Sequence, residues 1–217
     1  MISHRLKCIF VHIPKTAGTS LEFALFKDYE RTPSNLWGFR LPSNRQGGAL
    51  QHWKAKQIRQ EVGTEDFDRY FKFAFVRNPW DRMVSLFSYL TQTERIPRKR
   101  IRDFLGISQD ISFKAFVRTI CESEPHPHWE EQHKFVLDED GKLLVDFIGR
   151  YENLHQGYAY VCSRLPRLRR KVPLPRRLVS LHCSYLRYYD NETREMVADK
   201  YKTDRELFGY SFPKIYL

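Results

Sequence analysis

The stretch that decides the fold is residues 7–20, which read KCIFVHIPKTAGTS. Its first half, residues 7–13, is a compact apolar run that ends at a proline, which is typical of a short buried strand. Thr19, with Glu22 three residues later, fits a capping box, and the apolar residues beyond recur at helical spacing. The stretch therefore predicts a strand, a tight turn and a helix in direct succession.

A second strand-to-helix junction follows at residues 71–90. Residues 71–76 are another short apolar run, and Asn78 before Pro79 is typical of a helix that begins there and runs to about residue 90. Periodicity and turn residues indicate helices at residues 52–62, 113–122 and 192–207, a third strand at residues 142–148, and a loop at residues 36–48.

Strands that alternate with helices predict an α/β fold with a central, mainly parallel β-sheet flanked by helices. The length of 217 residues suits one domain over residues 1–217. Ligands of such sheets bind beyond the C-terminal ends of the strands, so we expect both junctions to face the same crevice.

The composition excludes several classes of protein. Hydrophobic residues make up 41% of the chain and aromatic residues 15%, so extended disorder is not expected. The uncharged apolar runs are far shorter than the roughly 20 residues that span a bilayer. The first residues also lack the pattern of a secretory signal. We therefore expect a cytoplasmic protein without a transmembrane segment, or a Golgi-lumen protein if a membrane anchor has been trimmed away.

The charge balance favours an anionic partner. Lys and Arg number 37 and Asp and Glu 26, which gives a formal net charge of +11, and basic residues gather at residues 98–102 and 164–177. Charge alone leaves nucleic acid, a membrane, a phosphorylated nucleotide and an acidic polymer open. We expect no nucleic-acid partner, because no RNA- or DNA-reading motif is present.

Disulfide and metal chemistry receive little support. The four cysteines are widely spaced without a C-x-x-C pair, which favours reduced thiols, and a Cys162–Cys183 bridge would need an oxidising lumen. His126, His128 and His133 fit no common zinc-ligand spacing, and no cysteine lies near them. We expect no metal site.

The turn at residues 14–20 has the composition of a phosphate cradle. Small residues let the backbone wrap around an oxyanion, and Gly18 permits dihedral angles that a side chain would forbid. The N-terminus of the following helix presents N–H groups and the positive end of its dipole. Lys15 adds a full charge, and the turn carries three hydroxyl groups. The lysine precedes the glycine, so the turn is not the Walker A loop G-x-x-x-x-G-K-[ST].

Arg77 and Ser85 give the second junction an anion-binding character as well. Arg77 follows the end of a strand, and Ser85 lies two turns into the next helix, away from its apolar stripe. The planar fork of an arginine suits a phosphate, and a serine hydroxyl adds a donor. The alternative for Arg77 is an ion pair with Asp81 that ties down the turn.

Together these motifs resemble those of the PAPS-dependent sulfotransferases, specifically the glycan O-sulfotransferases that include the heparan sulfate 2-O and chondroitin enzymes and their short bacterial relatives. PAPS, 3′-phosphoadenosine-5′-phosphosulfate, is the activated sulfate donor. Residues 10–20 resemble the family's 5′-phosphosulfate loop, and residues 75–82 with Ser85 resemble its 3′-phosphate motif. Weaker similarity covers residues 128–132, 146–154 and 206–210, so the resemblance spans nearly the whole chain.

The resemblance implies a P-loop-like, three-layer form of the α/β fold. It also implies an enzyme that moves a sulfuryl group from PAPS to a carbohydrate hydroxyl and releases adenosine 3′,5′-bisphosphate without a metal. The implied donor-binding residues are Pro14, Lys15, Thr16, Ala17, Gly18, Thr19 and Ser20 for the 5′-phosphosulfate, Arg77 and Ser85 for the 3′-phosphate, and Arg150 and Tyr151 beside the nucleotide. Residues 171–180 correspond to a loop that closes over the nucleotide in the family.

Sulfuryl transfer needs a base, a cation and in-line geometry. Lys15 suits charge that develops on the leaving phosphate, and histidine suits the base near neutral pH. His52 is the expected base, because the family carries its histidine at the start of the helix after the Gly-rich loop. His128 is the second candidate, whereas His12 is expected to be structural. The resemblance also implies a saccharide acceptor on the side of His128, Trp129 and Gln132, and an acidic saccharide is one candidate.

Two other functions remain open at this level. Residues 143–146 resemble a Walker B strand that ends in Asp146, which would suit a P-loop-like, ATP- and Mg²⁺-dependent kinase. The basic runs would also suit an anion-binding module without catalysis.

Overall fold

The computed structural model of the chain describes residues 1–26, 35–36, 50–92, 96–168, 173–175 and 183–213. The chain forms two compact units, each made of two segments. Unit 1 comprises Met1–Val76 and Gln132–Leu178, and unit 2 comprises Arg77–Glu131 and Val179–Leu217. The chain first passes from unit 1 to unit 2 between Val76 and Arg77. A single domain over residues 1–217 stays a prediction.

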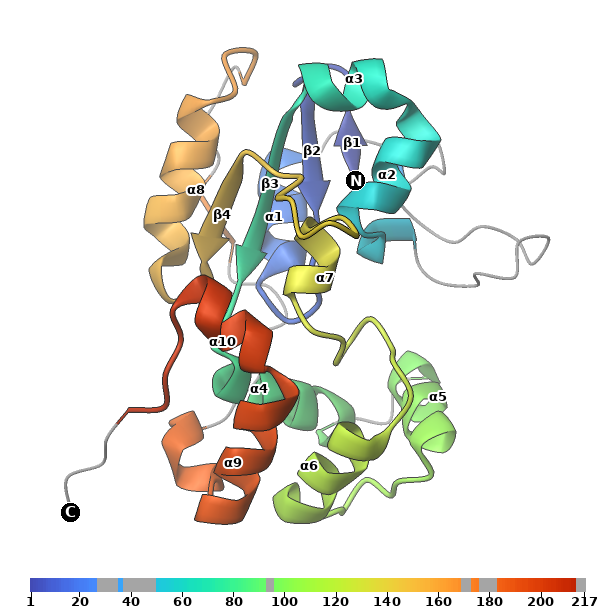
Figure 1. Ribbon diagram of the computed structural model, residues 1–217, viewed down its shortest axis with the longest axis vertical. Helices are drawn as coiled ribbons and strands as arrows, with labels where there is room; N and C mark the ends of the chain where they lie inside the picture. Colours follow the sequence, from blue (N-terminus) through green and yellow to red (C-terminus); the bar gives the residue numbers. More distant parts are fainter. Residues whose placement is uncertain (27–34, 37–49, 93–95, 169–172, 176–182, 214–217) are drawn as a thin grey trace. The chain divides into compact units, whose positions relative to one another are not determined.

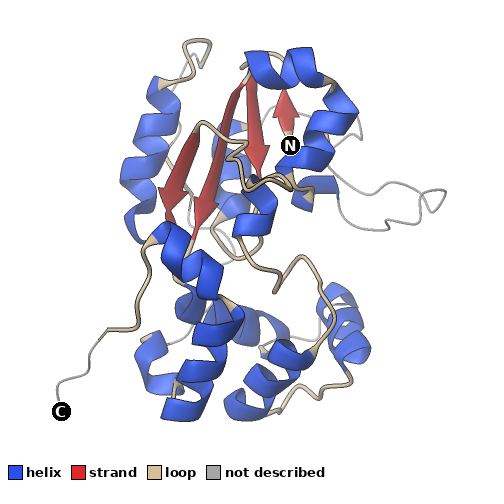
Figure 2. Ribbon diagram, in the orientation of Figure 1, coloured by secondary structure: helices blue, strands red, loops and turns tan. Residues whose placement is uncertain are grey.

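Unit 1 is built on a four-stranded sheet in the order β1-β2-β3-β4 (Figures 1 and 2). Strand β1 (Ile2–Ser3) pairs antiparallel with β2 (Cys8–Val11), whereas β2, β3 (Phe71–Val76) and β4 (Phe147–Arg150) run parallel. The C-terminal ends of the parallel strands therefore lie at one edge, where Val76 pairs with Arg150. This mainly parallel sheet with its helices confirms the predicted α/β fold class.

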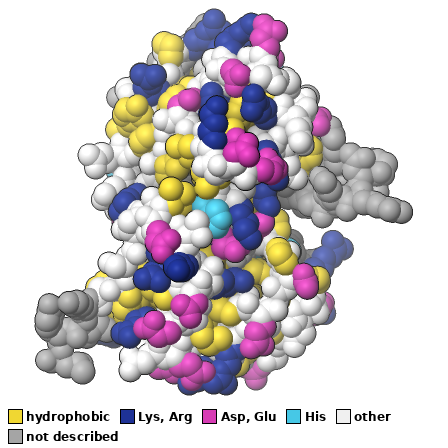
Figure 3. Space-filling model, in the orientation of Figure 1, with side chains coloured by type: hydrophobic (Ala, Val, Ile, Leu, Met, Phe, Trp, Pro, Cys, Tyr) yellow, Lys and Arg dark blue, Asp and Glu magenta, His cyan; other side chains and the backbone are white. Residues whose placement is uncertain are grey.

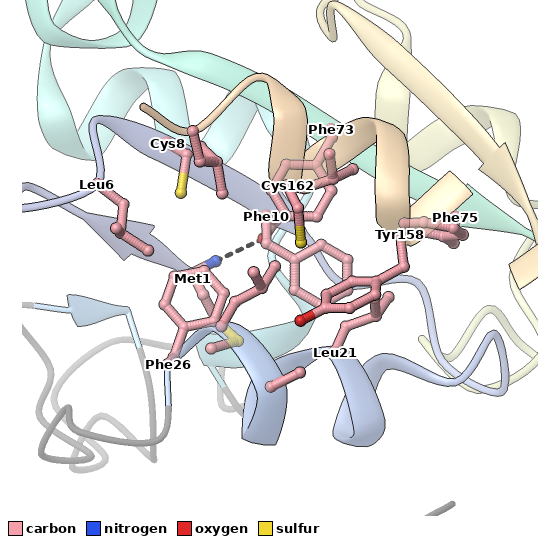
Figure 4. Packing of buried hydrophobic residues seen from close by; sticks show 14 residues of the cluster. Met1, Leu6, Cys8, Phe10, Leu21, Phe26, Phe73, Phe75, Tyr158 and Cys162 are labelled. Atoms are coloured by element: carbon pink, nitrogen blue, oxygen red, sulfur yellow. Dashed lines mark hydrogen bonds between the residues drawn. The ribbon is translucent and has the colours of Figure 1, made fainter. Parts of the chain in front are cut away.

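One face of the sheet is covered by α1 (Gly18–Leu25) and α8 (Leu154–Ser163). Alternate residues of a strand share a face, so Phe73 and Phe75 of β3 enter one apolar cluster with Phe10 of β2 and both helices (Figure 4). The rings of Phe10 and Phe73 stack with their centroids 5.0 Å apart. The same figure shows the Met1 amine, which donates to the carbonyl of Phe10 at 2.8 Å.

The other face carries α2 (Ala55–Val62), α3 (Thr64–Arg69) and α7 (His133–Val136) (Figure 1). Lys72 points to this face, and its Nζ donates to the carbonyls of Phe67 and Tyr70 at 3.2 and 2.8 Å. Both faces of the sheet are thus covered, which is the usual condition of parallel strands.

Unit 2 is helical in its described part. Its helices are α4 (Pro79–Thr91), α5 (Ile96–Leu105), α6 (Phe113–Glu122), α9 (Asn191–Lys200) and α10 (Lys202–Phe208). They pack around an apolar cluster that includes Trp80, Phe116, Trp129 and Val197. Asn78 caps α4 as expected, because its Oδ1 accepts from the backbone N–H groups of Trp80 and Asp81.

Strong local patterns located several elements correctly. The strand at residues 71–76 and the helix at residues 113–122 have the expected bounds. The first strand is shorter than expected, and the C-terminal helix is divided into α9 and α10 at Tyr201. The helix expected at residues 52–62 begins only at Ala55, since Leu50–His52 forms a separate 3₁₀ turn.

The third strand was expected too early in the chain. The prediction of residues 142–148 is wrong in its first half, because Leu143 forms only an isolated bridge with Leu137 and β4 begins at Phe147. Asp138 explains the difference: its Oδ1 accepts from the backbone N–H groups of Asp140 and Lys142, which stabilises a turn in place of the strand.

Two predicted segments lie largely outside the described residues. Apart from Leu36, the predicted loop at residues 36–48 lies outside the described residues, as does most of the segment 171–180, of which residues 173–175 are described. All four cysteines are described and are free thiols, so Cys162 and Cys183 are not bridged. Within the described ranges, no helix combines the length and apolarity that crossing a membrane requires.

Candidate functional site

The cradle is a closed turn between β2 and α1. Its backbone is left-handed at two residues with side chains, Lys15 (φ 72°) and Ala17 (φ 68°). Thr16 is fully buried, and its Oγ1 donates to the carbonyl of Ile13 at 2.8 Å. The N–H of Ser20 donates to the carbonyl of Ala17 at 2.9 Å. The turn therefore leads directly from the C-terminal edge of the sheet into a helix N-terminus, where backbone N–H groups favour an anion.

The capping box predicted for Thr19 and Glu22 is not formed. Helix α1 begins at Gly18, its N-cap residue is Ala17, and no side chain caps it. Glu22 instead accepts a hydrogen bond from His12, with 2.7 Å between Oε1 and Nδ1. Both side chains are buried, at 5% and 7% exposure. Sequence reasoning missed this pair, because the capping pattern assigned Glu22 to the helix end.

Gly18 is required for a different reason from the one predicted. Its φ is not among the positive values, so it supplies no special dihedral angle. A Cβ atom built on Gly18 would lie 1.8 Å from Nε2 of His12. The glycine is needed because the imidazole of His12 occupies the space of a side chain.

Two histidines lie side by side next to the cradle. The rings of His12 and His52 meet edge to face, with their centroids 4.7 Å apart. Nδ1 of His52 lies 3.3 Å from the carbonyl oxygen of His12. A carbonyl can only accept, so this contact assigns the proton of a neutral His52 to Nδ1 and makes Nε2 its basic nitrogen.

Exchanging alanine and glycine at positions 17 and 18 of the cradle should change the free energy of unfolding in opposite directions. We expect Ala17→Gly to raise the free energy of unfolding by about 0.5–1 kcal/mol, because a left-handed residue with a Cβ costs more than the extra flexibility of glycine. We expect Gly18→Ala to lower it by about 1–3 kcal/mol, through overlap with His12. Urea denaturation of both variants measures the difference, and a stable Gly18→Ala protein would contradict the described packing of His12.

The second motif lies in unit 2. Arg77 is the first residue after β3, and its Nε donates to Oδ2 of Asp81 at 2.7 Å, so the ion pair considered for it is formed. Asp81 and Ser85 are four residues apart on α4 and share a face of the helix. The side chain of Ser85 is buried, at 3% exposure. The pairing with Asp81 fixes the plane of the guanidinium group.

The three predicted acceptor residues differ in their surroundings. Trp129 is 1% exposed: its indole N–H donates to the carbonyl of Glu124, and its ring stacks on His126 at 4.4 Å. Gln132 is fully buried in unit 1. His128 is half-buried and stacks on Tyr89 with a centroid distance of 5.9 Å. Trp129 and Gln132 therefore belong to the packed interior in this structure, whereas His128 retains access to solvent.

The backbone that carries His128 is held by a buried arginine. The Nη atoms of Arg82 donate to the carbonyls of Glu130 and His128, at 2.8 and 3.4 Å. Burial lowers the pKa of Arg82, and nearby Tyr201 and Asp204 oppose that shift. Arg82 thus has a structural role in unit 2.

Basic residues of the run at residues 98–102 make several contacts within unit 2. In the run at residues 98–102, Lys99 pairs with Asp103, Arg102 is buried and donates to the carbonyl of Leu90, and Arg98 lies over the ring of Tyr89. On the face shown in Figure 3, basic and acidic side chains are interspersed. Part of the positive charge therefore serves local packing.

Asp146 does not occupy a Walker B position. It precedes β4 and accepts a hydrogen bond from the backbone N–H of Lys72, the second residue of β3, at 2.7 Å. This is the N-terminal end of both strands, opposite to the edge where the cradle begins. Asp146 also pairs with Nζ of Lys72 at 3.1 Å.

Metal ligands do not gather in the described part of the chain, where no three His, Cys, Asp or Glu side chains could hold an ion together. His126 and His128 stack on each other at 5.0 Å, and burial lowers the pKa of His126. The stacking of the two rings accounts for their proximity.

Comparison with known proteins decides the family. The model of the sulfotransferase family matches residues 1–211, nearly the whole chain. The chain belongs to the sulfotransferase family. An uncharacterized protein of Archaeoglobus fulgidus is 31% identical over 113 residues, which are 51% of this chain and 80% of that protein. Together with the mainly parallel sheet, family membership agrees with the P-loop-like fold that the motifs implied.

Curated relatives of this sulfotransferase-family chain include enzymes named for carbohydrates. Carbohydrate sulfotransferase 14 of Danio rerio is 29% identical over 168 residues, covering 66% of this chain and 45% of that protein. Carbohydrate sulfotransferase 11 of Rattus norvegicus is 26% identical over 171 residues, covering 66% and 48%. The chain thus spans about half the length of these relatives. No solved structure matches it.

Proposed function

We propose that the chain is a PAPS-dependent sulfotransferase that moves a sulfuryl group from PAPS to a hydroxyl group of a carbohydrate. The observation that carries this proposal is a lysine-bearing, non-Walker cradle at the C-terminal edge of the sheet, in a chain that matches the sulfotransferase family over residues 1–211. The names of the curated relatives support a saccharide acceptor.

The proposal gives the two phosphate motifs separate tasks. The cradle, residues 14–20, binds the 5′-phosphosulfate through backbone N–H groups, hydroxyls and the ammonium group of Lys15. Arg77 and Ser85 bind the 3′-phosphate, the group that distinguishes PAPS from ATP. Asp81 supports this assignment, since its contact with Nε of Arg77 orients the guanidinium fork that would bind a phosphate.

His52 and Lys15 carry the chemistry in this proposal. The acceptor oxygen attacks sulfur as the bond from sulfur to the bridging phosphate oxygen breaks, and the electron pair remains on the 5′-phosphate of the departing adenosine 3′,5′-bisphosphate. Nε2 of His52 takes the proton of the hydroxyl group. Lys15 stabilises the charge that develops on the leaving oxygen, so the step requires no metal.

His128 is the one predicted acceptor residue that we retain. Its imidazole is only half-buried and can contact a sugar hydroxyl, whereas Trp129 and Gln132 are buried in the packed interior. His128 also stays the second candidate for the base. The kinase alternative loses support, because Asp146 lies at the wrong end of the sheet and binds Lys72.

Selectivity for the 3′-phosphate tests the donor assignment. We expect Arg77→Ala to weaken binding of adenosine 3′,5′-bisphosphate about 10- to 150-fold, since hydrogen bonds to a charged group contribute about 1.5–3 kcal/mol. Binding of adenosine 5′-monophosphate, which lacks that phosphate, should stay unchanged. Isothermal titration calorimetry measures both affinities.

Two further variants serve as controls for this experiment. Arg77→Lys keeps the charge near Asp81 but lacks the guanidinium fork, so its loss of affinity for adenosine 3′,5′-bisphosphate should be intermediate. Arg118→Ala, at an exposed arginine of α6, should bind like the wild type. An equal loss of affinity for both nucleotides in Arg77→Ala would contradict a role in 3′-phosphate recognition.

A further inference from the structure

The buried contact between His12 and Glu22 joins the two ends of the cradle. His12 is the first residue after β2, and Glu22 lies in the second turn of α1, so the residues between them make up the whole turn. Their side chains meet at 2.7 Å. A carboxylate only accepts hydrogen bonds, so Nδ1 of His12 is the donor, and its Nε2 faces the Cα of Gly18.

The turn between these ends is strained. Left-handed dihedral angles at Lys15 and Ala17 cost roughly 1–2 kcal/mol per residue with a side chain. Such strain persists only where the surrounding structure holds the backbone in place. The His12–Glu22 contact supplies that restraint from both ends, and the close approach of His12 to Gly18 adds a third point of contact.

His12 also contacts His52 through both its ring and its backbone. Its ring is stacked on Phe10 at 5.4 Å on one side and meets the ring of His52 at 4.7 Å. Its carbonyl oxygen accepts from Nδ1 of His52 at 3.3 Å. These two contacts are the route by which a shift of His12 would reach His52.

We infer that Glu22 and His12 form a positioning pair, which holds the cradle in its strained form and orients His52 with Nε2 as the basic nitrogen. This inference rests on the proposed function for the role of His52 as the base. Neither residue touches the reacting atoms in this account. Glu22 acts through His12, and His12 acts through Gly18 and His52.

Three variants separate this role from simple stabilisation. Glu22→Ala removes the acceptor and should lower kcat for sulfate transfer about 10- to 100-fold, because small displacements of catalytic groups cost that much. Glu22→Gln keeps an acceptor oxygen and should recover most of the lost rate. His12→Asn keeps a donor toward Glu22 but removes the ring beside His52, so it should fold and still be slow. Glu65→Ala, at an exposed glutamate of α3, is the matched control.

A spectroscopic measurement tests the pair without any substrate. Nitrogen NMR of the histidine rings distinguishes the two neutral tautomers, and we expect both His12 and His52 to carry the proton on Nδ1 in the wild-type protein. In Glu22→Ala the signals of both rings should change, and in Glu22→Gln those of His52 should return to the wild-type positions. If Glu22→Ala does not fold, His12→Asn provides the same comparison at His52.

The two hypotheses fail in different ways. Wild-type rate and unchanged His52 signals in folded Glu22→Ala or His12→Asn would overturn the positioning pair and leave the proposed function intact. Absence of PAPS-dependent transfer in the wild-type protein would overturn the proposed function, and the NMR comparison would still decide whether the pair orients His52.

Discussion

Replacing His52 with alanine is expected to lower kcat for sulfate transfer about 10²–10⁴-fold, the usual contribution of a positioned general base. The expectation follows from the contact of Nδ1 with the carbonyl oxygen of His12, which makes Nε2 the nitrogen that we propose takes the proton of the acceptor hydroxyl. The affinity for adenosine 3′,5′-bisphosphate should change little, because His52 is proposed to contact the acceptor and not the nucleotide.

The pH dependence of the same variant gives a second readout. In the wild-type protein, kcat/KM should rise with pH as the base loses its proton, and this acidic limb should be absent in His52→Ala. His155→Ala, at an exposed histidine of α8, is the control and should retain full activity. If His52→Ala kept at least a third of the wild-type kcat, the base would lie elsewhere, and His128 would be the next residue to replace.

Replacing Lys15 should have an effect nearly as large. We expect Lys15→Ala to lower kcat about 10²–10³-fold, the loss that follows removal of one group aimed at developing charge. Lys15→Gly should be equally slow and at least as stable as Lys15→Ala, since glycine relieves the left-handed backbone at this position. A Lys15→Gly protein that is slow but as stable as the wild type would show that the lower rate comes from the chemical step and not from unfolding.

Lys142→Ala is the matched control for the charge. Lys142 is exposed in the turn before β4, so its loss removes one positive charge from unit 1 without touching the cradle. Single-turnover rates with PAPS and thermal unfolding together measure the effects. An active Lys15→Gly protein would contradict the assignment of the lysine to the leaving group.

Elements with strong local signals could be predicted from the sequence. The apolar run of β3 and the proline after Asn78 each specify structure within a few residues, and the structure has both where the sequence indicated. The turn between β2 and α1 could be located for the same reason, whereas phosphate binding by residues 14–20 stays a prediction.

Features that depend on distant contacts could not be predicted. The capping pattern placed Glu22 in a contact with the helix N-terminus, but in the structure Glu22 accepts a hydrogen bond from His12 across the turn. The requirement for Gly18 comes from the ring of His12, which no dihedral argument reveals. Asp146 resembles a nucleotide-binding carboxylate in the sequence, but in the structure it accepts a hydrogen bond from Lys72 of β3. A polar histidine beside an apolar strand, followed by a glutamate after the turn, is the signal that could have indicated the buried pair.

Calorimetric titration of the wild-type protein with adenosine 3′,5′-bisphosphate tests the central claim most directly. The experiment is performed in the presence of a metal chelator, with ATP and Mg²⁺ titrated separately for comparison. We expect tight binding of adenosine 3′,5′-bisphosphate that does not depend on metal, and much weaker binding of ATP with Mg²⁺. If the protein bound ATP with Mg²⁺ but did not bind adenosine 3′,5′-bisphosphate, the proposed donor would be wrong and the kinase interpretation would be restored.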